Sequence, residues 1–197
     1  METHRPRRPR TPRVLGTALM LFMAWHGAAT AANGQTPSQE WRVEAAFLYN
    51  FAKFVEWPAG SSVSGSAPLT FCLMGAGPLQ SALEDSLAGK AINGHSLVVR
   101  QIGRAEDAPN CQVTFIGGDE RKRLPALLEA LNGAAVLTVA DFEQFASHGG
   151  MIQLIKEENK FRFAVNVDAV KGHGLRVSSR LLQLAEVVHN SGVKDKP

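Results

Sequence analysis

Short apolar runs that alternate with helix-forming segments constrain the fold of this chain more than any other feature of its sequence. Four such runs come at Leu69–Met74, Leu97–Ile102, Cys111–Ile116 and Ala135–Val139. Helices are expected between them at Pro78–Ala88 and Asp119–Leu131. Strands that alternate with helices form βαβ units, so the pattern predicts a mostly parallel sheet with helices on both faces. For the four runs, taken in chain order, we expect the strand order 2-1-3-4 of doubly wound sheets.

The alternation ends after the fourth run. The remaining elements are expected to be a short helix at Phe142–Ala146, two strands at Met151–Lys156 and Phe161–Val167, and a last helix from Ser178 or Ser179 through Val188. The two strands are separated by hairpin length, so they should form an antiparallel pair at the edge of the sheet. The predicted fold class is therefore α/β, a three-layer mostly parallel sheet with a 2-1-3-4 core and an edge hairpin.

A strongly apolar helix is expected ahead of the first strand. The tetrapeptide Thr36-Pro37-Ser38-Gln39 has the form of a capping box with Thr36 as the N-cap. The helix should run to Val55 and stop near Trp57-Pro58, because the residue before a proline avoids the helical conformation. Its apolar residues form two adjacent stripes. The aromatic side chains among them either pack in the core or form a surface that a partner covers.

The first 32 residues have the pattern of a secretory signal peptide. An arginine-rich stretch is followed by an apolar run from Val14 to Trp25 and by small residues that end at Ala31 and Ala32. The apolar run is shorter than the roughly 20 residues that span a bilayer. We expect cleavage after Ala31 or Ala32, export to a bacterial periplasm, and a single mature domain at residues 33–197.

Charge and cysteine content narrow the expected partners. Beyond residue 32 the chain has 16 Lys and Arg against 17 Asp and Glu. The net positive charge of the full chain therefore comes from its first 32 residues, and no nucleic-acid partner is expected. The two cysteines are Cys72 and Cys111. An oxidising compartment favours a disulfide between them, with free buried thiols or a redox pair as the alternatives.

Motifs for catalysis and metal binding are scarce. The histidines beyond residue 32 show neither HxxxH spacing nor a Cys-His cluster. No GxSxG, CxxC or P-loop pattern is present. We therefore expect no cofactor, no metal and no enzyme activity. Gly75-Ala76-Gly77-Pro78 follows the first predicted strand, where doubly wound folds bind ligands. A simple tight turn is the favoured interpretation of this tetrapeptide.

Several segments are together similar to the YfiR family of small periplasmic proteins. They are Ala45–Pro58, Phe71–Gly75, Gly149–Ile152 and Gly174–Leu182, and the resemblance covers essentially the whole mature chain. It implies a homodimeric α/β protein that represses an inner-membrane diguanylate cyclase by binding its periplasmic part. An outer-membrane lipoprotein would relieve the repression by capturing the repressor. Cys72 and Cys111 match the family's disulfide, whereas a second cysteine pair found in part of the family is missing.

The connection between the last predicted strand and the last helix is apolar, although a connection is expected at the surface. It is either pinned to the core or offers a recess to a partner. If a partner docks there, the expected contacts are the apolar residues Val167, Val170, Val177 and Leu182 and the rim charges Arg176 and Arg180.

Two functions are consistent with these patterns. The first is a non-catalytic periplasmic regulator that represses a membrane diguanylate cyclase and so lowers cyclic-di-GMP. The alternative is a periplasmic small-ligand-binding protein that reports to a sensor kinase or a transporter. Its site would be the crevice near Gly75–Pro78 together with Arg176.

Overall fold

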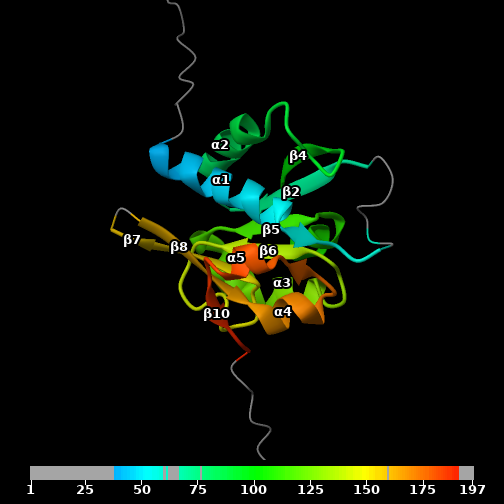
Figure 1. Ribbon diagram of the computed structural model, residues 1–197, viewed down its shortest axis with the longest axis vertical. Coiled ribbons are helices and arrows are strands. Elements are labelled where there is room, and N and C mark those ends of the chain that lie inside the picture. Colours follow the sequence, from blue (N-terminus) through cyan, green and yellow to red (C-terminus); the bar gives the residue numbers. More distant parts are fainter. Residues whose placement is uncertain (1–37, 60, 62–66, 76, 159, 191–197) are drawn as a thin grey trace, which may run out of the picture. The chain divides into compact units, whose positions relative to one another are not determined.

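An eight-stranded mixed sheet is the centre of the structure (Figure 1). The structure is a computed structural model that describes residues 38–59, 61, 67–75, 77–158 and 160–190, all within one compact unit. From one edge to the other, the strands are β10 (Glu186–Val188), β8 (Lys160–Asn166), β7 (Ile152–Glu157), β6 (Leu137–Ala140), β5 (Val113–Ile116), β2 (Leu69–Met74), β4 (His95–Gln101) and β3 (Ala91–Ile92). The predicted order 2-1-3-4 is confirmed by β4, β2, β5 and β6, which pair in parallel.

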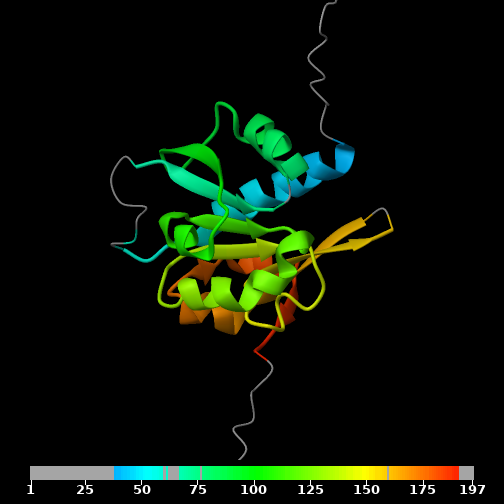
Figure 2. The same cartoon turned by 180° about the vertical axis from the view of Figure 1, so that it is seen from behind.

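The predicted hairpin is formed by β7 and β8, which pair antiparallel on the far side of β6. It extends beyond the neighbouring strands in both views (Figures 1 and 2). The hairpin does not form the edge of the sheet as predicted, because a further short strand, β10, pairs in parallel with the outer side of β8. At the opposite edge, β3 turns into β4 through Asn93 and Gly94, whose φ angles of 51° and 86° suit a tight two-residue turn.

Helices cover both faces of the sheet (Figures 1 and 2). One face packs against α1 (Gln39–Lys53), α2 (Gly77–Leu87), α4 (Val167–Gly172) and α5 (Ser179–Leu182). The other packs against α3 (Leu124–Ala130) and the 3-10 helix η1 (Ala105–Asn110), and the 3-10 helix η2 (Gly118–Arg123) leads into α3. The predicted three-layer α/β class is therefore confirmed. Within the described residues, no helix is long and apolar enough to cross a membrane.

The alternation of side chains along each strand separates two cores. In β2, Phe71 and Leu73 belong to the larger core under α1, whereas Met74 belongs to the smaller core under α3. Phe51 of α1 packs on Phe163 of β8 with ring centroids 5.0 Å apart. Parallel strands that are covered on both faces favour apolar residues at most positions, which explains the nearly continuous apolar runs of the sequence.

A disulfide joins Cys72 of β2 to Cys111, two residues before β5, with a Cα–Cα distance of 6.0 Å. Both side chains are buried. Beside the disulfide, the backbone N–H of Gln112 donates to the carbonyl of Thr70 at 3.0 Å, and the Gln112 Oε1 accepts the N–H of Thr70 at 2.7 Å. The covalent bond and these hydrogen bonds fix the seam between the two central strands.

The ends of the first helix differ from the prediction. The N-cap of α1 is Ser38, whose side chain accepts a backbone N–H of the first turn, while the predicted cap Thr36 lies outside the described residues. α1 ends at Lys53 and not near Trp57. The two residues of β1 (Val55–Glu56) pair antiparallel with β9 (Arg176–Val177). Backbone bonds to a distant segment therefore replace the last predicted turn.

Three other predicted helices need correction. The last one is confined to α5, because the β-branched residues around Val188 form β10 on the edge of β8. Phe142–Ala146 forms turns, with Gln144 at a φ of 65° that no helix accommodates. The helix predicted at Asp119–Leu131 is divided into η2 and α3, because Pro125 fits only the first turn of an α-helix.

We expect the double substitution Cys72→Ala and Cys111→Ala to lower the free energy of unfolding by about 4 kcal/mol. The reason is that the unfolded chain regains the entropy removed by closing a separation of 39 residues. Urea unfolding followed by circular dichroism measures the difference. The parent protein unfolded and refolded in reductant should show the same loss, and an unchanged midpoint in both samples would contradict a stabilising role.

Candidate functional site

α4 begins at a buried asparagine. Asn166 is 0% exposed, and its Oδ1 accepts the N–H groups of Asp168 and Ala169 at 3.1 and 3.0 Å. Its Nδ2 donates to the carbonyl of Ala146 at 2.6 Å and to Oδ1 of Asn190 at 2.8 Å. One side chain thus caps the helix and joins it to two other segments.

α4 ends in a glycine cap that explains why the connection after it is apolar. Gly174 has a φ of 72°, and its N–H donates to the carbonyl of Lys171 at 3.0 Å. The N–H of Leu175 donates to the carbonyl of Val170 at 3.1 Å. These two bonds define a Schellman motif, in which the residue after the glycine packs on the last turn of the helix. Val170 and Leu175 are accordingly buried, so this part of the connection is pinned to the core.

The residues directly after α1 hold the segment that follows the glycine cap of α4. β1 and β9 pair with Val55 opposite Val177 and Glu56 opposite Arg176. The N–H of Ser178 donates to the carbonyl of Phe54 at 3.0 Å, while its side chain caps α5. The C-terminal connection is therefore fixed to the chain between α1 and the first central strand.

The six residues predicted to contact a partner divide into three groups. Val170 is 3% exposed and lies inside the core, so its substitution acts first on the fold. Val167, Val177 and Leu182 are half-buried and pack against the larger core with part of each side chain still accessible. The arginines Arg176 and Arg180 are exposed, and neither forms an ion pair with a described residue. Contact with a partner stays a prediction for all six.

Two exposed apolar side chains next along the chain were missed by the sequence analysis. Leu184 is 73% exposed and Val187 is 51% exposed. The sequence analysis expects Leu184 within a helix that reaches Val188, but α5 ends two residues before Leu184. Together with Arg176, Arg180 and Leu182, which lie in the same stretch of the chain from Arg176 to Val187, we call them the C-terminal surface.

A polar network fixes β10, which carries part of this surface. The carboxyl of Asp168 accepts the N–H of Asn190 at 3.1 Å and lies 3.2 Å from Nδ1 of His189. The hydrogen bond from Asn190, and then the imidazole, hold the pKa of Asp168 below its ordinary value. The end of β10 is thereby tied to the first turn of α4.

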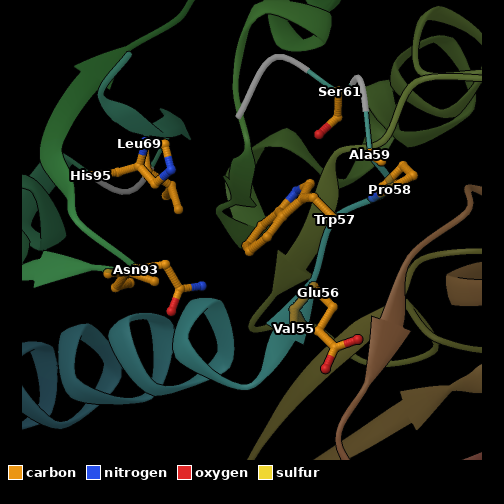
Figure 3. A pocket seen from close by; sticks show the side chains of 10 residues that line it. Val55, Glu56, Trp57, Pro58, Ala59, Ser61, Leu69, Asn93 and His95 are labelled. Atoms are coloured by element: carbon orange, nitrogen blue, oxygen red, sulfur yellow. The ribbon is translucent and has the colours of Figure 1, made fainter. Parts of the chain in front are cut away.

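A cavity of about 480 Å³ lies beside β1 (Figure 3). The indole of Trp57 extends into it, between the two strands that carry Leu69 and His95 and the segment that carries Ser61. The carboxylate of Glu56 points away from the indole. The Nε1 of Trp57 is buried and has no acceptor among the described residues. A buried donor without an acceptor is unfavourable, so a ligand that reached Nε1 from the cavity would have to offer an acceptor.

A family model described as YfiR/HmsC-like matches residues 42–186. The chain belongs to the YfiR/HmsC-like family. The match includes α1 from Arg42 onward, the whole C-terminal connection and the first residue of β10, so it covers the cavity and all of the C-terminal surface of this YfiR/HmsC-like protein except Val187.

Two solved structures are similar to this YfiR/HmsC-like chain. A conserved domain protein from Vibrio cholerae matches with a TM-score of 0.51 and 12% identity, over 73% of this chain and 59% of that chain. An ABC domain in complex with L-Trp from Streptococcus pneumoniae matches with a TM-score of 0.48 and 7% identity, over 73% of this chain and 60% of that chain. This chain thus spans about three fifths of each, and the first likeness shows the fold alone.

The crevice considered for a ligand is not assembled in the YfiR/HmsC-like structure. Gly75 follows the end of β2, whereas Arg176 pairs with Glu56 next to the cavity that reaches Leu69 at the start of β2. Six residues of strand separate these ends by about 20 Å. In the described part of the chain, no group of three or more His, Cys, Asp or Glu side chains is placed to hold a metal ion.

We expect Asn166→Ala in this YfiR/HmsC-like protein to lower the free energy of unfolding by roughly 2–4 kcal/mol, because it removes a helix cap and leaves buried partners unsatisfied. Asn166→Ser keeps a side-chain oxygen that can cap the helix and loses the bonds donated by Nδ2, so its loss should be smaller. Thermal or urea unfolding ranks the two variants. Equal losses would show that the cap contributes little.

Proposed function

We propose that this chain is a non-catalytic periplasmic regulator that binds the periplasmic part of an inner-membrane diguanylate cyclase and lowers production of cyclic-di-GMP. Membership of the YfiR/HmsC-like family supports the class of function. The signal-peptide pattern of residues 1–32 supports export and a mature domain at residues 33–197.

The observation that carries the proposal is the C-terminal surface. It combines two strongly exposed apolar side chains, Leu184 and Val187, with two arginines that lack ion-pair partners in the described residues. Exposed apolar side chains and arginines are both typical of protein interaction sites. Such a surface fits a partner with an apolar recess and acidic residues around it.

Repression would act through the equilibrium between active and inactive forms of the cyclase. A bound regulator can lower activity only if it binds the inactive form more tightly than the active one. The regulator therefore needs no catalytic group of its own. The family resemblance extends the proposal to a homodimer and to release of the cyclase when an outer-membrane lipoprotein captures the regulator.

We expect Arg176→Glu with Arg180→Glu to weaken binding to the periplasmic part of the cyclase roughly tenfold or more, about 1.4 kcal/mol, since both charges would face acidic groups of the partner. Calorimetry or surface plasmon resonance measures the affinity. Arg100→Glu is the matched control, because Arg100 is an exposed arginine on β4, far along the sheet from β10.

The same variants can be compared in cells. Deletion of the gene should raise intracellular cyclic-di-GMP, and the full chain or its Arg100→Glu variant should restore the low level. The double variant and a chain without residues 1–32 should not restore it. An unchanged level after deletion would remove repression of a cyclase as the main role.

A second candidate function is binding of a small ligand in the cavity beside β1. It is favoured by Trp57, which lines a cavity of about 480 Å³ and whose buried Nε1 has no acceptor among the described residues. The ligand would have an apolar body and a hydrogen-bond acceptor. The cavity is lined by β1, and β1 pairs with β9, which carries Arg176 of the C-terminal surface. A sensor kinase or a transporter that recognises the ligand-bound protein would therefore contact the same region.

We expect Trp57→Phe to weaken binding of anilinonaphthalene sulfonate, a probe with apolar rings and an acceptor group, because the variant keeps the aromatic wall and loses the donor. Fluorescence titration gives the affinity. Trp41→Phe, on α1, is the matched control. Equal affinity of both variants and the parent would exclude the indole as the recognition group.

A further inference from the structure

α1 carries a carboxyl group on its buried side. Glu44 is 4% exposed, and its Oε2 has no hydrogen-bond partner among the described residues. It lies three residues after Trp41 and four before Leu48, in line with the apolar stripe of the helix. A buried carboxylate is strongly unfavourable unless charges or hydrogen bonds compensate it.

The charges that act on Glu44 do not compensate it. Asp141 at the end of β6 and Glu40 on α1 are both negative, and Lys156 on β7 is the positive group. Lys156 is shared, since it forms an ion pair with Glu40. Burial, and then these two carboxylates, raise the pKa of Glu44 to about 7.

We propose that Glu44 makes the anchoring of α1 to the sheet depend on pH: a neutral carboxyl holds the helix in place and an ionised one loosens it. The unfolded chain releases this proton near pH 4.5 and the folded chain near pH 7. A rise in pH therefore favours the unfolded chain. The stability that depends on Glu44 is complete below pH 4.5 and is lost as the pH rises to about 7.

The effect on α1 reaches further elements through bonds already described. The carbonyl of Phe54, directly after α1, accepts the N–H of Ser178 at 3.0 Å, and β1 pairs with β9. A looser α1 thus loosens the support of the C-terminal connection. The proposal concerns the chain alone and does not need a partner to be tested.

The test is urea unfolding of the mature parent and of Glu44→Gln, each at pH 6 and at pH 8. From pH 6 to pH 8 the unfolding equilibrium constant should rise about tenfold more in the parent than in Glu44→Gln, which lacks the ionising carboxyl group. Other titrating groups are common to both proteins and cancel in this comparison. The same pH dependence in parent and variant would overturn the proposal.

Three further variants sharpen the result. Glu129→Gln changes an exposed carboxyl on α3 and should behave as the parent. Asp141→Asn should reduce the tenfold difference, because it removes a negative charge that favours the protonated form, and Lys156→Met should enlarge it. A change in the opposite direction for either of these two would contradict the role of the surrounding charges.

Amide hydrogen exchange locates the effect. At pH 8, α1 should exchange more slowly in Glu44→Gln than in the parent, whereas α3, on the other face of the sheet, should change less. Equal changes in both helices would show that Glu44 acts on global stability alone and would overturn a specific effect on α1.

Discussion

The burial of α1 against the sheet is the interaction on which the rest of the molecule depends. Leu48 and Phe51 are both 0% exposed, and burying each contributes about 2–3 kcal/mol. Once α1 lies across the larger core, its end can direct β1 toward β9 and Trp57 toward the cavity. The two candidate sites are therefore consequences of how one helix packs.

The sequence predicts the central sheet well because its strands are buried on both faces. Continuous apolar runs such as Leu69–Met74 require no knowledge of their neighbours to be recognised. Elements that depend on tertiary contact were missed. β1 and β9 have two residues each and exist only through their pairing. α4 was hidden because its cap, Asn166, ends a strand whose apolar alternation continues into Val167.

The candidate sites could be predicted only in part. The apolar connection was recognised, and the structure shows why Val170 and Leu175 are apolar: they close a helix cap against the core. Exposure of Leu184 could not be foreseen while a longer helix was expected there. Glu44 did carry a signal, since the helical spacing that buries Leu48 also buries a carboxyl four residues earlier. No feature of the sequence indicates that the indole N–H of Trp57 lacks an acceptor among the described residues.

Both outermost strands of the sheet are very short, with two residues in β3 and three in β10. Each covers part of a seven-residue strand, β4 or β8, that would otherwise form the edge. A long free edge offers unpaired backbone groups to other chains and promotes aggregation. β10 is therefore a protective cover as well as part of a surface. A chain truncated before Glu186 would expose β8, and its poor solubility could be mistaken for a loss of regulation.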